Sequence, residues 1–251
     1  MKHFHSILVL LFLASCASLL LSMYNTGLSK IVFCNVGQGA ATLLQMGRYQ
    51  VLIDTGPDQR VLSCIGRHIP FFDYVIEVVI ISHNQKDHNG GLLALQNKYS
   101  IEHVVGPLPK PSFLKKEQFI EVEDTVSLRI QDADIVIHKA SQSSKDINET
   151  ANVVTLTTPR HTIFLPSDIN GLELKRLMPM QTTILEVPHH GSKYGLYPDS
   201  VGLATPIWGV ISVGKKNSYG HPSKEVLDIL KAKNIQVWRT DVQGELVVDL
   251  K

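Results

Sequence analysis

The hydrophobic residues of this chain fall into short runs that glycines and polar residues separate. From Ser29 onward most runs are too short for a helix and are rich in β-branched residues, which predicts strands. In chain order, the predicted strands are Lys30–Val36, Ala41–Met46, Gln50–Ile53, Val75–Ser82, Ile101–Val105, Val126–Ile130, Ile135–His138, Val153–Thr157, Thr162–Leu165, Thr183–Val187, Trp208–Val213, Ile235–Arg239 and Glu245–Val248.

Helical periodicity appears at intervals between these strands. The predicted helices are Val61–His68, Gly91–Lys98, Leu172–Leu177 and Lys224–Lys233. The Pro- and Lys-rich stretch Gly106–Glu123 predicts a surface excursion, and Ser141–Glu149 predicts a polar loop. Two successive β-rich halves, each with helices, indicate an α/β fold in which two sheets pack face to face with helices outside. We expect one domain over residues 28–251.

Residues 6–23 form an uncharged apolar segment that follows Lys2. Its length is near the roughly 20 residues that a membrane-spanning helix needs. A cleaved secretory signal is an alternative, and Leu13–Cys16 resembles a bacterial lipobox, in which Cys16 would be lipidated. We favour an uncleaved anchor over residues 1–27, because the segment stays apolar beyond either cleavage position. The body would then lie on the extracytoplasmic side of the cell membrane or in the envelope.

Charge and cysteine content narrow the function classes. A net charge of +1 gives no overall attraction to nucleic acid, although a local basic groove remains open. Three cysteines are too few and too scattered for a disulfide framework or a cysteine zinc site. We therefore expect Cys34 and Cys64 to be buried small hydrophobic residues.

Acidic and imidazole side chains follow four of the predicted strands. Asp54 follows one strand, and the motif Ser82–Gly91, with His83, Asp87 and His88, follows another. Asp168 and the pair His189-His190 come after two later strands. Nitrogen and oxygen donors of this kind suit zinc, manganese or iron. Each cluster alone has an ordinary explanation, since Asp168 can cap a helix, so the prediction of a metal site depends on their common position.

Several motifs in this order resemble the metallo-β-lactamase superfamily, and within it the C-terminal domain of ComEC-type competence proteins. The motifs are FCNVGQGAA (33–41), VLIDTG (51–56), ISHNQKDHNGG (81–91), FLPSDI (164–169), VPHHGS (187–192), ISVGKKNSYGHPSKEVLDIL (211–230) and WRTDVQG (238–244). The resemblance implies a four-layer αββα sandwich with one or two metal ions, zinc or manganese, at one edge of the sheets.

Matching positions imply roles for individual residues. His83 would bind the first metal, Asp87, His88 and His190 the second, and Asp168 would bridge them, while Asp54 would orient a histidine ligand. A metal-bound hydroxide would attack phosphorus or a carbonyl carbon. The residues that the resemblance places beside the substrate are His189, Ser192, Lys193, Asn217, Tyr219 and His221, with Asp87, His189 and His221 in catalysis.

The chain departs from the family pattern at several positions. Gln85 stands where the family has a histidine or aspartate ligand, and a neutral amide is a weaker ligand. Asn35 and Ala40 replace two acids, and Ala151-Asn152 replaces an Asn-Ser pair. These changes predict a mononuclear or weakly dinuclear enzyme, with a hydrolytically inactive descendant as the alternative.

Three functions remain open at this stage. The first is a phosphodiesterase or nuclease that acts on phosphodiesters, including single-stranded DNA, because the loops near the motifs carry Lys86, Lys193, Lys215, Lys216 and Arg239 together with tyrosines. The second is an acyl, lactam or thioester hydrolase of the same superfamily. The third is a catalytically impaired module that binds DNA or a partner. The sequence indicates membrane association but no obligate protein partner.

Overall fold

The computed structural model describes residues 7, 9–16, 18, 28–141, 146–148, 150–202 and 204–251. Much of the apolar segment predicted as an anchor lies outside these residues, and the described ones between 7 and 18 are helical. Within the described parts of the chain, no helix has both the length and the apolar character needed to cross a bilayer.

The first sheet is built from the N-terminal half and is closed at one edge by the last strand. Its order is β14 (Leu246–Asp249), β1 (Ser29–Phe33), β2 (Thr42–Met46), β3 (Tyr49–Ile53), β4 (Val75–Ile80), β5 (Ser100–Gly106) and β6 (Phe119–Glu121). Strand β2 is antiparallel to both β1 and β3, and β3 to β6 pair in parallel. Strands β1, β3, β4 and β5 therefore end at the same edge of the sheet.

The second sheet comes from the C-terminal half. Its order is β13 (Gln236–Arg239), β12 (Trp208–Ile211), β11 (Ile184–Glu186), β10 (Thr162–Leu165), β9 (Asn152–Thr157), β8 (Ala133–Lys139) and β7 (Thr125–Ile130). Strands β10 to β13 are parallel, while β7, β8, β9 and β10 form antiparallel neighbours. The parallel strands again bring their carboxyl ends to one edge.

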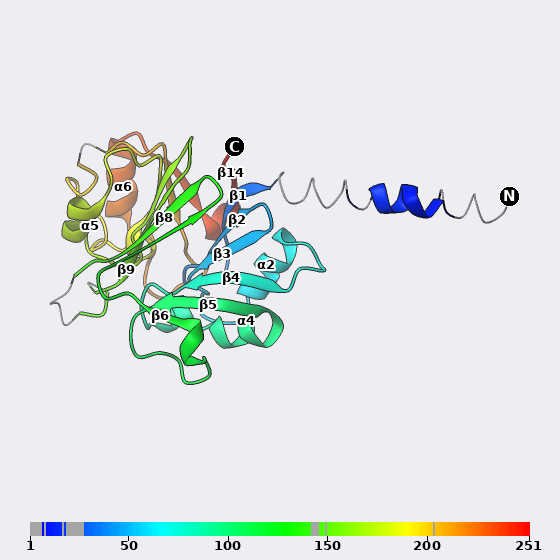
Figure 1. Cartoon of the computed structure of the whole chain (residues 1–251). Coiled ribbons are helices and arrows are strands. Elements are labelled where there is room, and N and C mark those ends of the chain that lie inside the picture. The colour runs from blue at the N-terminus through cyan, green and yellow to red at the C-terminus, as the bar shows by residue number, and fades with distance from the viewer. Residues whose placement is uncertain are drawn as a thin grey trace.

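Helices cover the outer face of each sheet (Figure 1). These helices are α2 (Val61–His68) and α4 (Leu92–Lys98) on the first sheet, and α5 (Gly171–Leu177) and α6 (Lys224–Ala232) on the second. The remaining short helical segments are α3 (Lys86–Asn89), α7 (Thr240–Gln243) and the 3-10 turns η1 (Lys116–Gln118) and η2 (Pro188–Gly191). The two-residue period of the strands explains the layers: Ile31 and Phe33 pack between the sheets, whereas Val32 and Cys34 pack against α2. The prediction of two stacked sheets with helices outside is confirmed.

Two element predictions need correction. The stretch Gly106–Glu123 is more than a surface excursion, because β6 within it extends the first sheet beside β5. The first predicted strand ends at Phe33 rather than Val36, because the chain turns at Gly37, whose φ is +81°. Helices α3 and α7, each of four residues, were not predicted, since so short a segment shows no helical period.

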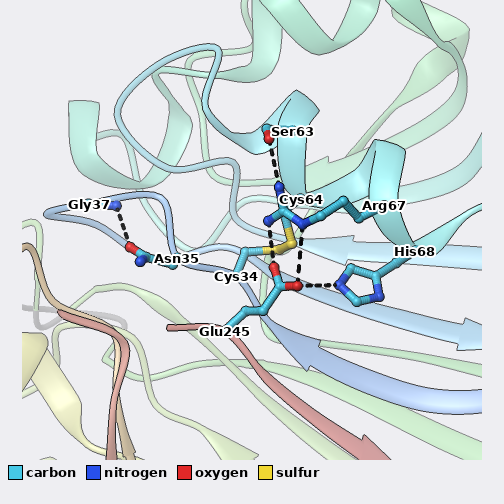
Figure 2. Close-up of a disulfide and its surroundings, with 8 residues drawn as sticks. All are labelled: Cys34, Asn35, Gly37, Ser63, Cys64, Arg67, His68 and Glu245. Carbon is cyan, nitrogen blue, oxygen red and sulfur yellow. Dashed lines mark hydrogen bonds and ion pairs between the residues drawn. A yellow bond between two sulfur atoms is a disulfide. The ribbon is translucent and has the colours of Figure 1, made fainter. Parts of the chain in front are cut away.

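The prediction for the cysteines is wrong: Cys34 and Cys64 form a disulfide, with Cα atoms 5.8 Å apart (Figure 2). Both residues are fully buried, as expected. The bond follows from packing, because Cys34 directly follows β1 and α2 lies across that strand. A separation of 30 residues along the chain gives no sign of this proximity.

Candidate metal centre

The strand ends that carry acids and imidazoles meet at one edge of the two sheets. Asp54 follows β3 and His83 follows β4, while Asp168 and His190 follow β10 and β11 in the other sheet. The chain turns sharply at these points: Asp54, Ser167, His189 and His190 all have φ between 52° and 58°. Non-glycine residues rarely adopt this left-handed conformation, and such residues gather at functional sites.

Four side chains converge closely enough to share one cation. Asp87, His88, Asp168 and His190 each offer a ligand atom, and these atoms all lie within 4.8 Å of one another. Nε2 of His88 is 3.2 Å from Oδ1 of Asp168, and Nε2 of His190 is 3.4 Å from Oδ2 of Asp87. His88, Asp168 and His190 are buried, whereas Asp87 is partly open to solvent. The cluster can therefore be reached from one side.

Hydrogen bonds orient the two histidines. Nδ1 of His88 lies 2.7 Å from Oδ2 of Asp54, and Nδ1 of His190 lies 2.8 Å from the carbonyl oxygen of Ser212. A carboxylate and a carbonyl both accept hydrogen bonds, so each Nδ1 carries a proton and each Nε2 faces the cluster, where a metal ion can take the place of a second proton. Support of this kind usually fixes the tautomer of a metal-binding histidine.

Buried atoms that no protein group satisfies test whether a cation fits. Within the described part of the chain, Nε2 of His83, His88 and His190 and Oδ2 of Asp168 are buried without a hydrogen-bond partner. Leaving such polar atoms unpaired in the interior costs free energy. All four atoms belong to this edge of the sheets, and a cation held by the cluster would satisfy the three that belong to His88, Asp168 and His190. The donor set therefore fits a divalent metal.

The protonation states also suit a cation. Burial raises the pKa of the Asp168 carboxyl, but His88 and His190 outweigh it and hold that pKa well below its usual range. Burial lowers the pKa of His88, while Asp168 and Asp54 outweigh it and raise the pKa well above the ordinary value. Two carboxylates around His88 thus create a demand for positive charge, which a proton or a metal can meet.

His83 and Gln85 lie beside the four-residue cluster but outside it. The His83 ring lies 4.2 Å from the His88 ring and is tilted by 50° to it, and burial lowers the pKa of His83 to about 4, so it is neutral at pH 7. The amide of Gln85 instead donates to Oδ1 of Asn148 at 2.5 Å. The position of a first metal therefore has one well-placed imidazole and an amide engaged elsewhere.

The residues expected beside a substrate separate into two groups. His189, Tyr219 and His221 line a cavity of about 520 Å³ together with Asp87 and His190. The Tyr219 ring stacks on His221, and Nδ1 of His221 is buried without a hydrogen-bond partner.

The second group lies outside this cavity. Ser192 is buried, and Lys193 lies over the Tyr194 ring. The Asn217 amide bonds to the carbonyl oxygens of Gly214 and His221, so it shapes the loop between them.

Sequence reasoning missed several residues that support the cluster. Ser82 donates its backbone N–H and its hydroxyl to Asp54, at 2.8 Å each, and Ser167 donates to the Ser82 hydroxyl. Buried Glu186 accepts from the Ser212 hydroxyl at 2.6 Å, and burial raises its pKa. The position of Ser82 immediately before His83 was the available signal, whereas nothing along the chain links Glu186 to residue 212.

The loop around Gly39 packs against the backbone of Asp87, one of the four clustered residues. The N–H of Ala40 donates to the carbonyl of Asp87 at 3.1 Å. A Cβ atom on Gly39, whose φ is +141°, would lie 2.3 Å from that carbonyl oxygen. Only glycine permits both this conformation and this approach.

Comparisons with known proteins agree with this architecture. The family model of the metallo-beta-lactamase superfamily matches residues 34–197. The chain is similar to ComE operon protein 3 of Bacillus subtilis (strain 168), with 27% identity over 84% of this chain and 32% of that protein. It is also similar to competence protein ComA of Neisseria gonorrhoeae, with 22% identity over 84% of this chain and 31% of that protein. The chain spans about a third of the length of these relatives.

A solved structure shows the same fold. The metallo-beta-lactamase fold protein YhfI from Bacillus subtilis superposes with a TM-score of 0.60 and 15% identity, covering 88% of this chain and 99% of that one. The sheets, the site at their shared edge and the family model lead to one conclusion. The chain belongs to the metallo-beta-lactamase superfamily and shares its domain with competence proteins.

Proposed function

We propose that this protein is a metal-dependent phosphodiesterase with nuclease-like activity, and that zinc is its metal, with manganese as the second choice. The observation that carries the proposal is the cluster of Asp87, His88, Asp168 and His190, whose ligand atoms lie within 4.8 Å and open onto a cavity. Two carboxylates and two imidazoles suit either metal. A cation held there supplies a Lewis acid and makes water nucleophilic at neutral pH.

The protein's own groups divide the remaining work. Asp54 and the Ser212 carbonyl hold the rings of His88 and His190, so that the metal ligands need not reorganise. His189 and His221 line the cavity beside Asp87, and their ring nitrogens would donate hydrogen bonds to the oxygens of the substrate. The same cavity contains Lys86 and Arg60, whose charges favour an anionic substrate.

We further propose that the domain works in the cell envelope, outside the cytoplasm. The buried Cys34–Cys64 disulfide supports this, because such bonds persist in oxidising compartments and are rare in the cytosol. The apolar segment 6–23 would hold the chain at the membrane, as a retained anchor in preference to a lipidated Cys16. The similarity of the chain to competence proteins makes single-stranded DNA a suitable test substrate.

The test is hydrolysis of bis-p-nitrophenyl phosphate and single-stranded DNA by the full chain, with zinc or manganese added. We expect turnover that EDTA abolishes and that Asp87→Ala lowers by more than about 100-fold, because a metal ligand is lost. Asp132→Ala, which removes an exposed carboxylate in a turn, is the matched control. A turnover rate that is unchanged by EDTA, or unchanged in Asp87→Ala, contradicts the proposal. Faster hydrolysis of nitrocefin or a thioester would assign the site to acyl transfer instead.

A further inference from the structure

A second cavity adjoins the metal centre. It measures about 480 Å³ and is lined by Asn35, Gly37, Gln38, Arg60, Gly214, Lys215, Lys216 and Asn217. Gln38 and Arg60 also line the cavity that contains Asp87 and His190, so the two cavities share a wall. A ligand bound at the metal centre can therefore extend into this second space.

The lining of the second cavity is cationic. It includes Arg60, Lys215 and Lys216 and no carboxylate. Arg60 pairs with Asp58, whose two carboxylate oxygens lie 2.9 Å from Nε and from Nη2. Both lysines are exposed. Three positive side chains around one hollow attract an anion, and the flexible lysines can follow its position.

The Arg60 side chain lies against the loop of Gly37. Its guanidinium pairs with Asp58, both side chains being about half exposed, and its Nη1 lies over Gly37, where a Cβ atom would come within 2.1 Å of it. Gly37 also has a φ of +81°, so a side chain there would be excluded twice. Arg60 is therefore packed directly onto the loop that separates the two cavities.

The opposite wall is joined to the same loop. The N–H of Gly214, which precedes the two lysines, donates to Oε1 of Gln38 at 3.2 Å. A Cβ atom on Gly214 would lie 2.6 Å from the backbone nitrogen of Gln38. The Cys34–Cys64 disulfide ties the start of this loop to α2 (Figure 2). Arg60 is the N-cap of that helix. Arg60 and the segment that carries Lys215 and Lys216 thus both pack against the Asn35–Gln38 loop.

We propose that this second cavity binds a phosphate of a polymeric phosphodiester, next to the phosphate that is cleaved at the metal centre. The inference rests on the proposed phosphodiesterase function and adds a separate binding site, at Arg60, Lys215 and Lys216, for a neighbouring phosphate of an oligonucleotide. A small diester has one phosphate and cannot place a phosphate in both cavities at once. An oligonucleotide can, because its charged groups repeat along the chain.

The test compares two substrates and two double variants of the full chain. Lys215→Ala/Lys216→Ala removes two of the three cations of the second cavity, and Lys231→Ala/Lys233→Ala makes the same charge change at the exposed end of α6. We expect the first variant to lower the ratio of kcat/KM for a single-stranded oligonucleotide to that for bis-p-nitrophenyl phosphate by about ten-fold. The control should change this ratio less than about two-fold. Equal ratios in the two variants overturn the proposal.

Oligonucleotide binding separates this inference from the proposed function. If the wild-type chain hydrolyses neither substrate, the proposed function fails, and fluorescence anisotropy with a labelled oligonucleotide tests the cavity alone. We then expect Lys215→Ala/Lys216→Ala to weaken binding about ten-fold and to reduce the slope of log Kd against log salt by about 0.7 per lysine. A slope equal to that of the α6 control, or no binding by the wild-type chain, overturns the inference.

Discussion

At the scale of single residues, the centre depends on how each donor is aimed. His88 and His190 both present Nε2 to the cluster because Asp54 and the Ser212 carbonyl occupy the other ring nitrogen. Asp168 is buried between them and stays ionised, because the neighbouring imidazoles lower its pKa more than burial raises it. A buried carboxylate such as that of Asp168 destabilises the folded protein unless a positive charge lies beside it.

Gln85 marks the weak side of the centre. Its amide donates to Asn148, so it does not supply the charge that a second cation beside His83 needs. We predict that Gln85→Asp raises zinc occupancy from about one towards two ions per chain, because a carboxylate is a far stronger ligand than an amide. Elemental analysis after dialysis at neutral pH measures this. Occupancy that stays at the wild-type value would show that Gln85 is not what limits the second site.

The sequence motifs predicted that the four clustered residues and Asp54 share one edge of the sheets, because all of them lie in segments that follow recognisable strands. Their binding of a metal stays a prediction. The residues that support the cluster were harder to predict from the sequence. Glu186 and Ser212 belong to neighbouring strands or their ends, and their contact depends on how those strands are aligned. The disulfide was missed for the same reason. Periodicity shows which face of an element is buried, but not which buried side chain of another element it meets.

At the scale of elements, α2 is attached to the first sheet at two points (Figure 2). The Cys34–Cys64 disulfide fixes one side of the helix to the end of β1. Near its carboxyl end, Arg67 and His68 both contact Glu245, just before β14, at 2.6 Å and 2.9 Å. The helix that begins after Arg60 is therefore attached next to β1 and next to β14, which are neighbours in the sheet.

We predict that Cys34→Ala/Cys64→Ala lowers the free energy of unfolding by about 3 to 4 kcal/mol, because a disulfide that closes a loop of this length restricts the unfolded chain. Urea unfolding followed by circular dichroism measures the loss. Reducing the wild-type chain should produce a similar loss, while the same reductant should leave the variant unaffected. A variant as stable as the oxidised wild type would contradict this role for the bond.

Element types were easier to predict from sequence than element limits. The buried strands of both sheets were placed correctly because β-branched runs mark them, and α2 and α6 because their apolar faces repeat. Strand β6 was missed since it is short and lies in a Pro- and Lys-rich stretch. Its pairing with β5 supplies a stabilisation that its own residues do not reveal.

At the scale of the whole molecule, two stacked sheets create the centre by ending their parallel strands at one edge. Strand β1 is antiparallel to β2, which is antiparallel to β3, so Ser29 begins the domain at the opposite edge. The candidate metal centre therefore lies at the edge of the first sheet that is farther from Ser29.

Metal binding by the full chain tests the central claim, that donors distant in sequence converge to hold a cation. The wild-type protein is loaded with zinc, dialysed at neutral pH to remove the excess, and analysed by inductively coupled plasma mass spectrometry. We predict that it retains about one zinc ion per chain. Asp168→Asn keeps the shape of the side chain but removes the charge between His88 and His190, and it should retain far less. Asp132→Asn is the control and should match the wild type. A wild-type chain without bound metal, or an Asp168→Asn chain with full occupancy, would contradict the account.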